Sequence, residues 1–281
     1  MKKPQWITLA VAVLLMAALF LARTVPAKKV AGTKEEHQHD LAENLLPVDS
    51  ILVMAKDQLG PSQKEKVETL ENSLSKADKE EKIHLYHQLA RFWSDSVKIF
   101  EPYAWYEAEA ARLENSEKSL TFAARLFLDN LQTDAVTERR QWKALESKDL
   151  FERSLKLNPA NDSAKAGIGA CYLFGNIAQN PMEGVSRIKD VVERDSTNLY
   201  AQMLMAKGLL MSGQYDKAIN RLQTVNRLET NNLEAIMLLA DTFERTGDKQ
   251  NAVAWYQKSI PLIMQPEMKA AVAERIKELQ N

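Results

Sequence analysis

The C-terminal third of the chain repeats itself at a fixed spacing of 34 residues. When Asn198–Asn226 is aligned with Asn232–Ile260, nine of 29 positions are identical, many of them small or turn-forming residues. A period of this length is typical of stacked helix–turn–helix units, each of which buries its apolar face against its neighbours. No stretch alternates polar and apolar residues for long enough to indicate strands. The repeat therefore predicts an all-α solenoid.

The repeated residues also mark where the helices begin and end. Asn198 and Asn232 occupy equivalent positions before an apolar run, so we expect them to be N-caps. Gly213 and Gly247 follow the first helix of each unit, where a glycine accommodates the left-handed backbone of a helix C-terminus. These four positions predict two helical hairpins of matching length.

This pattern resembles the tetratricopeptide repeat (TPR), a 34-residue pair of antiparallel helices. The unit 199–232 departs from the family pattern because it lacks the aromatic residue and the closing proline. The resemblance implies stacked hairpins whose first helices line a concave groove that binds a peptide or a helix of another protein. The family pattern appears in 233–266 as Ile236, Leu239, Ala240, Phe243, Ala252, Tyr256 and Ser259.

Weaker units precede the clear repeats. The unit 162–198 fits if its turn, near Asn176–Pro181, holds about three extra residues. The helix Thr137–Leu157 is interpreted as the second helix of an earlier unit, with Ser119–Leu131 as its first helix and a long insertion between them. One long helix is expected from Asp78 to Ile99, and Pro102 is expected to open the next.

The whole chain divides into five parts on this interpretation. The fold class is all-α, a TPR-like solenoid preceded by one N-terminal transmembrane helix. We assign 1–25 to a membrane anchor or uncleaved signal, 26–46 to a polar linker, 47–161 to degenerate helical repeats, 162–266 to TPR repeats (162–198, 199–232 and 233–266), and 267–281 to a capping helix.

The N-terminal segment Ile7–Ala22 contains a single polar residue, Thr8. Sixteen helical residues rise about 24 Å, slightly less than a hydrocarbon core of about 30 Å. We favour an uncleaved anchor that contacts the membrane through residues 6–22, because the run exceeds the usual core of a signal peptide. A signal peptide cleaved near Val25–Ala27 and a buried soluble helix remain as alternatives.

The position of the folded part relative to the membrane is weakly indicated. Basic residues flank the apolar run almost equally, so the positive-inside rule gives little guidance. We expect the bulk of the chain to be extracytoplasmic or periplasmic, with the cytoplasmic side as the alternative.

Charge and motif content argue against several functions. Residues 30–281 carry 32 basic and 38 acidic side chains, a balance unfavourable for nonspecific binding of nucleic acid. The chain lacks the common nucleotide, hydrolase and metalloprotease motifs. Cys171, the single cysteine, has no visible base nearby and is interpreted as a core residue, while His84 and His87 lack a third metal ligand. We therefore expect no catalysis, no cofactor and no metal.

The function predicted from these features is a membrane-tethered scaffold or adaptor that binds a partner protein. Two alternatives remain: a structural, self-assembling envelope protein, which would form a homo-oligomer, and an accessory subunit of a membrane-associated enzyme complex. Packing of the same side chains against neighbouring helices competes with the groove interpretation. Replacing Met203 and Met237 by Glu is expected to abolish partner capture without unfolding the chain. The family register places partner-binding side chains at Tyr200, Met203, Lys207, Leu210, Met211, Glu234, Met237, Asp241 and Arg245.

Overall fold

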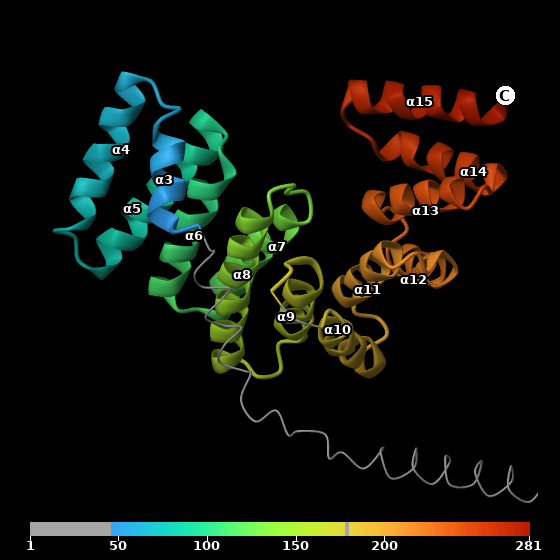
Figure 1. The fold of residues 1–281 in the computed structure, drawn as a ribbon, viewed down its shortest axis with the longest axis horizontal. Coiled ribbons are helices and arrows are strands. Elements are labelled where there is room, and N and C mark those ends of the chain that lie inside the picture. The colour runs from blue at the N-terminus through green and yellow to red at the C-terminus, as the bar shows by residue number, and fades with distance from the viewer. Residues whose placement is uncertain (1–45, 178–179) are drawn as a thin grey trace, which may run out of the picture. The chain divides into compact units, whose positions relative to one another are not determined.

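A computed structural model describes residues 46–177 and 180–281. Within these ranges every regular element is helical and no strand occurs, so the predicted all-α solenoid is confirmed for this part of the chain. Figure 1 shows the helices following one another from blue to red. The helices are α3 (Val48–Lys56), α4 (Pro61–Leu74), α5 (Lys79–Arg91), α6 (Phe100–Glu114), α7 (Glu117–Leu131), α8 (Thr137–Leu157), α9 (Asp162–Phe174), α10 (Met182–Arg194), α11 (Leu199–Met211), α12 (Tyr215–Leu228), α13 (Leu233–Arg245), α14 (Lys249–Ser259) and α15 (Pro266–Gln280).

The predicted membrane segment, Ile7–Ala22, and the linker up to residue 45 lie outside the described residues. Among the helices of the described part, none combines the length and the apolar character needed to cross a bilayer.

The predicted helix caps are confirmed in both clear repeats. The Oδ1 atom of Asn198 accepts a hydrogen bond from the backbone N–H of Ala201 at 3.0 Å, and Asn232 caps α13 in the same way. Gly213 and Gly247 adopt φ angles of +71° and +85°, the left-handed conformation that favours glycine at these helix ends. Short-range side-chain chemistry therefore sets the boundaries of these hairpins.

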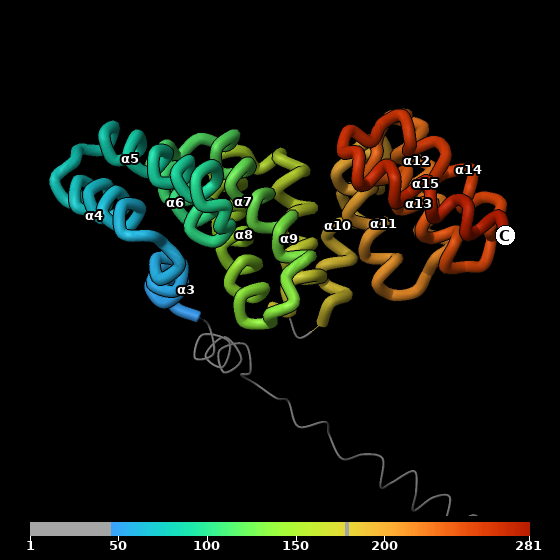
Figure 2. The backbone as a smooth tube through the Cα atoms, turned by 90° about the horizontal axis from the view of Figure 1, so that it is seen from above, coloured from blue at the N-terminus to red at the C-terminus, as the bar shows by residue number. Residues whose placement is uncertain are grey.

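Helices that follow one another in the sequence pack together as hairpins. The pairs α7–α8, α9–α10, α11–α12 and α13–α14 make extensive contacts, and α10 and α12 each pack on the first helix of the next pair. The same succession is visible from above in Figure 2. The hydrophobic core that includes Ile51 and Met205 is continuous across residue 161, where the degenerate and the clear repeats were expected to meet.

Two helix boundaries and one connection differ from expectation. The segment expected as one helix from Asp78 to Ile99 ends as α-helix at Arg91 and continues as a π-helical turn, η1 (Phe92–Val97). Phe92 and Trp93 are both buried, and the wider π turn reduces the angle between successive side chains, so both rings reach the core. Pro102 is the third residue of α6 rather than its first. The helix α8 spans Thr137–Leu157 as expected, but only residues 132–136 separate it from α7, so the long insertion expected between these two helices is not found there.

The helices α9 and α10 pack closely where they cross, because each has a glycine at the contact. A Cβ atom at Gly184 would collide with the carbonyl oxygen of Gly169 and would lie 2.9 Å from the backbone nitrogen of Leu173. Gly167 leaves room for the ring of Phe151 from α8. These small residues let α9 sit close to both neighbours, and every residue from Ala166 to Cys171 is buried.

A buried network of charged groups holds the α7–α8 connection. The Asp134 carboxylate accepts hydrogen bonds from both Nε and Nη2 of Arg139, at 2.6 and 2.8 Å, and from Lys143 Nζ at 2.7 Å. The Lys143 side chain is only 2% exposed and also contacts Glu101 of α6 at 2.8 Å. Burial would by itself raise the pKa of Asp134. The hydrogen bonds from Arg139, Lys143 and the Val136 backbone outweigh it and lower that pKa well below its ordinary value.

This network predicts a loss of stability in acid. Because the folded-state pKa of Asp134 is lowered, its contribution is complete above the unfolded-state pKa of about 4 and is lost as the pH falls below it. The free energy of unfolding should therefore fall by up to about 1.4 kcal/mol per pH unit from this one group. Urea denaturation of the native chain and of Asp134→Asn between pH 6 and pH 3 measures the difference in slope.

Asp129 serves as a control, because its effect on the free energy of unfolding in acid is expected to have the opposite sign. Desolvation raises the pKa of Asp129, so this group adds stability as the pH falls, and Asp129→Asn should steepen the loss in acid. Equal slopes for the native chain and Asp134→Asn would contradict the role assigned to Asp134.

Candidate functional site

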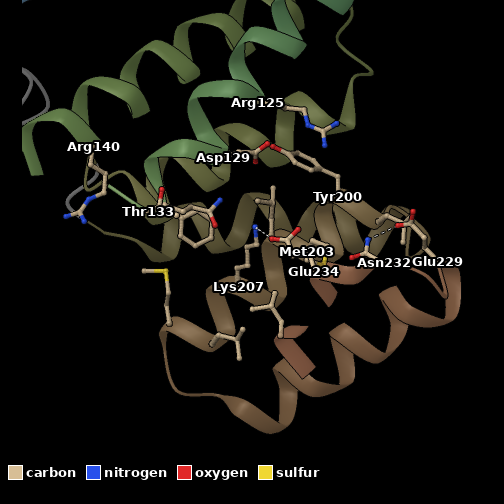
Figure 3. A pocket seen from close by; sticks show the side chains of 17 residues that line it. Arg125, Asp129, Thr133, Arg140, Tyr200, Met203, Lys207, Glu229, Asn232 and Glu234 are labelled. Atoms are coloured by element: carbon tan, nitrogen blue, oxygen red, sulfur yellow. Dashed lines mark hydrogen bonds and ion pairs between the residues drawn. The ribbon is translucent and has the colours of Figure 1, made fainter. Parts of the chain in front are cut away.

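A groove with a volume of about 960 Å³ lies between the first helices of successive hairpins. Its walls come from α7, α11 and α13, while α8 and α9 contribute one residue each. Figure 3 shows these side chains converging on the hollow. The lining residues are Arg125, Asp129, Gln132, Thr133, Arg140, Phe174, Leu199, Tyr200, Met203, Leu204, Lys207, Leu210, Met211, Glu229, Asn232, Glu234 and Leu238.

The groove continues along the surface of α7. A second hollow of about 600 Å³ shares Arg125 and Asp129 with the first and extends past Leu126 to the exposed ring of Phe122. The combined surface is elongated rather than closed around one point. An elongated surface suits a segment of polypeptide better than a compact small molecule.

Six of the nine residues expected to bind a partner line this groove. Met237, Asp241 and Arg245 do not, because α13 turns Glu234 and Leu238 towards the hollow instead. The Asp241 carboxylate accepts a hydrogen bond from Tyr256 Oη at 2.6 Å. The six that line the groove are Tyr200, Met203, Lys207, Leu210, Met211 and Glu234.

The methionines of the groove differ greatly in exposure. Met203 is 8% exposed and Met237 is half-buried, and both pack with the core around α13. Met211, at the end of α11, is 66% exposed. The expectation that Met203 can be replaced by Glu without unfolding is therefore wrong, because the charge would be buried. Met211 is the residue whose replacement can probe the groove.

The wall that α7 and α8 contribute was not predicted from the sequence. In these helices the repeat pattern is too degenerate for groove positions to be transferred from the clear repeats by alignment. The residues concerned are Arg125, Asp129, Thr133 and Arg140. Sequence periodicity shows that α7 is amphipathic but does not reveal which of its polar residues face α11. The remaining signal, the apolar stripe of α7, points to the core rather than to the groove.

Arg125 and Tyr200 connect α7 and α11 at one end of the groove. The guanidinium carbon of Arg125 lies 4.3 Å from the centre of the Tyr200 ring, within the range of a cation–π contact. The Tyr200 Oη atom is buried without a hydrogen-bond partner among the described residues. Burial raises the pKa of this hydroxyl, so it remains protonated and can donate a hydrogen bond.

The acidic residues of the groove are held in different ways. Glu234 pairs with Lys207 at 2.6 Å, and Glu229 accepts a hydrogen bond from Asn232 at 2.7 Å. Crowding by the groove walls desolvates Asp129 and raises its pKa, although Lys207 and Arg125 favour its charged form. The groove thus combines apolar side chains with charges of both signs.

Arg140 lies at the other end of the groove from Arg125 (Figure 3). Its Nη1 atom donates a long hydrogen bond of 3.4 Å to the backbone oxygen of Asp134. Its Nε atom is buried and has no partner in the described part of the chain. Both ends of the groove therefore present a guanidinium group and a donor without a partner.

Other groups singled out in the sequence lie outside the groove. Cys171 is fully buried, as expected of a core residue, and burial raises the pKa of its thiol to about 12. His87 lies between two carboxylates of α6, with Nδ1 3.2 Å from Glu107 and Nε2 3.0 Å from Glu114. Over residues 46–177 and 180–281, no three His, Cys, Asp or Glu side chains converge as a metal site would require.

Comparison with known proteins supports the repeat assignment. The tetratricopeptide repeat family matches residues 209–274, which include most of the two clear repeats. A search of curated proteins found no match. The similarity to the tetratricopeptide repeat is therefore supported for residues 209–274 by this match and by the 34-residue repeat pattern.

Solved structures that resemble this chain are distant from it in sequence. TTC0263, a thermophilic TPR protein of Thermus thermophilus, is 15% identical with a TM-score of 0.51, over 72% of this chain and 99% of its own. Pseudomonas aeruginosa pilF is 13% identical with a TM-score of 0.47, over 72% and 85%. MamA of Desulfovibrio magneticus RS-1, from residue 41 to its end, is 22% identical with a TM-score of 0.41, over 64% and 94%. Of these three, TTC0263 alone supports the shared fold, because the other two TM-scores are too low to carry an argument.

Proposed function

We propose that this chain is a membrane-tethered TPR scaffold that captures a segment of a partner protein in the groove between α7, α11 and α13. The observation that carries the proposal is the elongated groove of about 960 Å³, in which exposed apolar and charged side chains lie together. Such a mixture is typical of surfaces that bind protein segments. Proteins of this repeat family are generally scaffolds for protein interaction and are typically not catalysts.

The proposed tether is the apolar segment Ile7–Ala22, followed by the polar linker 26–46. A linker of about twenty residues can span at most about 70 Å even when fully extended, so the folded part would stay near the bilayer. Tethering would raise the local concentration of the groove for partners at the same membrane. We place the folded part on the extracytoplasmic side.

Replacing Met211 by Glu tests the groove. Met211 is exposed, so the substitution should change the free energy of unfolding by no more than about 0.5 kcal/mol. A charge in the apolar part of the groove should lower partner capture by about tenfold, as expected when an apolar contact of a binding site is lost. Crosslinking in cells, followed by purification and mass spectrometry, measures capture by the native chain and the variant.

Met264→Glu is the matched control, because Met264 is 85% exposed and does not line the groove. An equal loss of capture in both variants would contradict the groove proposal. Crosslinks solely between copies of this chain would favour the alternative of a self-assembling envelope protein. A captured enzyme subunit would identify an accessory role within the same proposal.

A further inference from the structure

We propose that the groove recognises an amphipathic helix carrying two carboxylates about two helical turns apart, one bound by Arg125 and Tyr200 and the other by Arg140. This inference rests on the proposed function, because it specifies the chemistry of the partner segment in the same groove. Four observations support it: the hydrogen-bond donors, the charges, the spacing of the two ends and the apolar surface between them.

The donors without partners gather in this groove. In the part of the chain that the structure describes, four buried side-chain polar atoms make no hydrogen bond, and two of them, Tyr200 Oη and Arg140 Nε, belong to residues that line the groove. The other two are indole nitrogens of Trp93 and Trp142, which do not line it. Both groove atoms can donate, and the Arg140 nitrogen cannot accept, so the complementary ligand supplies acceptors.

The two arginines of the groove also favour a ligand that supplies acceptors. Among the described residues, no carboxylate lies within ion-pairing distance of Arg125, which stacks on Tyr200, or of Arg140, whose contact is a backbone oxygen. Lys207 and Glu234, in contrast, neutralise each other. A carboxylate satisfies a guanidinium group with short, charge-assisted hydrogen bonds, so acidic side chains are the complementary acceptors.

A helix can present one carboxylate to each end of the groove. Arg125 and Arg140 lie at opposite ends of the groove, and Asp129 and Thr133 lie between them (Figure 3). Along α7, the rise from Arg125 to its last residue, Leu131, is about 9 Å. Two residues seven or eight positions apart on a partner helix are separated by about 10–12 Å and lie on one face.

The groove also contains apolar side chains and the carboxylate of Asp129, and both affect which partner segment it can bind. Leu210 and Met211 can cover apolar residues of the partner helix between its two carboxylates. Asp129 lies on the same wall as Arg125, one turn further along α7. Its charge acts on both Arg125 and Tyr200, so it opposes a partner carboxylate at that end, and the donors of Arg125 and Tyr200 must outweigh it.

Designed helical peptides test this inference on the full chain in detergent micelles. One fluorescent peptide carries two Glu seven positions apart with Leu between them. A second has the same composition with the Glu on opposite faces, and a third carries Lys in place of Glu. Fluorescence anisotropy should show that the first binds at least about tenfold more tightly than the others, and that added salt weakens its binding.

Single substitutions test whether Arg125 and Arg140 each bind one carboxylate of the peptide. Arg125→Gln and Arg140→Gln should each weaken binding of the first peptide by about fivefold to tenfold, as expected for the loss of one charge-assisted contact. Arg153→Gln is the matched control, because Arg153 pairs with Asp149 on the exposed surface of α8 outside the groove. It should leave the affinity unchanged.

Tyr200→Phe separates recognition from folding. The variant loses the hydroxyl alone, which is unpaired in the free protein, so the melting temperature should stay the same or rise. Affinity for the acidic peptide should nevertheless fall by about threefold or more, because the bound carboxylate loses a donor. A simple packing role would lower the melting temperature and leave selectivity for the acidic peptide intact.

The outcomes distinguish this inference from the proposed function. If Met211→Glu abolishes partner capture but the Glu and Lys peptides bind equally, the groove function stands and the carboxylate inference is overturned. If neither arginine variant changes the affinity, the inference is overturned as well. If Met211→Glu leaves capture unchanged and no peptide binds, both fall. Selective binding that both arginine variants weaken supports the inference.

Discussion

Gly184→Ala should lower the free energy of unfolding by about 2–3 kcal/mol, even though alanine is the better helix former by about 1 kcal/mol. The added Cβ atom would meet the carbonyl oxygen of Gly169 and the backbone nitrogen of Leu173. Neither atom belongs to a flexible side chain, so α9 and α10 must move apart. Since α10 also packs against α11, which supplies much of the groove, partner capture should decrease together with stability.

Gly208→Ala is the control for this prediction. Its added Cβ atom would lie 2.7 Å from Cδ2 of Leu173, the end of a side chain that can rotate away. The gain in helix propensity should balance that adjustment, so the expected change lies within about 1 kcal/mol. Thermal unfolding followed by circular dichroism measures both variants. Equal melting temperatures for Gly184→Ala and Gly208→Ala would mean that the α9–α10 crossing tolerates a methyl group.

Lys143→Met should lower the free energy of unfolding by about 3–5 kcal/mol. The Lys143 ammonium group is buried and contacts Asp134 at 2.7 Å and Glu101 at 2.8 Å. Methionine has a similar length but no charge, so it leaves two carboxylates with Arg139 as their remaining cation. An incompletely neutralised buried charge is far more costly than the loss of an exposed ion pair.

Urea denaturation of Lys143→Met and Lys148→Met compares the free-energy cost of losing a buried ion pair with that of losing an exposed one. Lys148 pairs with Glu152 four residues further along α8, and both side chains are partly exposed, so Lys148→Met should cost no more than about 0.5 kcal/mol. Adding Glu101→Gln to Lys143→Met should recover part of the lost free energy of unfolding, because one of the two incompletely paired carboxylates is then removed. No recovery would show that Lys143 acts through packing rather than through charge.

The helix boundaries of the clear repeats could be predicted because their causes are local. An Asn side chain that caps a helix reaches an N–H three residues away, as Asn198 and Asn232 do. A glycine at a helix end adopts a positive φ angle because it has no Cβ atom, as at Gly213 and Gly247. Neither effect depends on the rest of the fold.

The π turn after α5 shows where local reasoning failed. The sequence from Asp78 to Ile99 is consistent with one continuous helix, and no proline or glycine interrupts it. Burial of the adjacent Phe92 and Trp93 against the neighbouring helices accompanies the wider turn. Contacts between distant segments decided the backbone at this point.

The amino-acid sequence by itself determined the helical repeat, its period, its caps and the face of each repeat helix that turns towards its partner. These properties follow from spacings of three, four and 34 residues along one chain. The tertiary structure alone decided that Arg125 of α7 stacks on Tyr200 of α11, and that Arg140 closes the other end of the groove. The reason is that α7 and α11 belong to different hairpins and are brought together because both pack on α9, and no local spacing in the sequence encodes such a contact between distant segments.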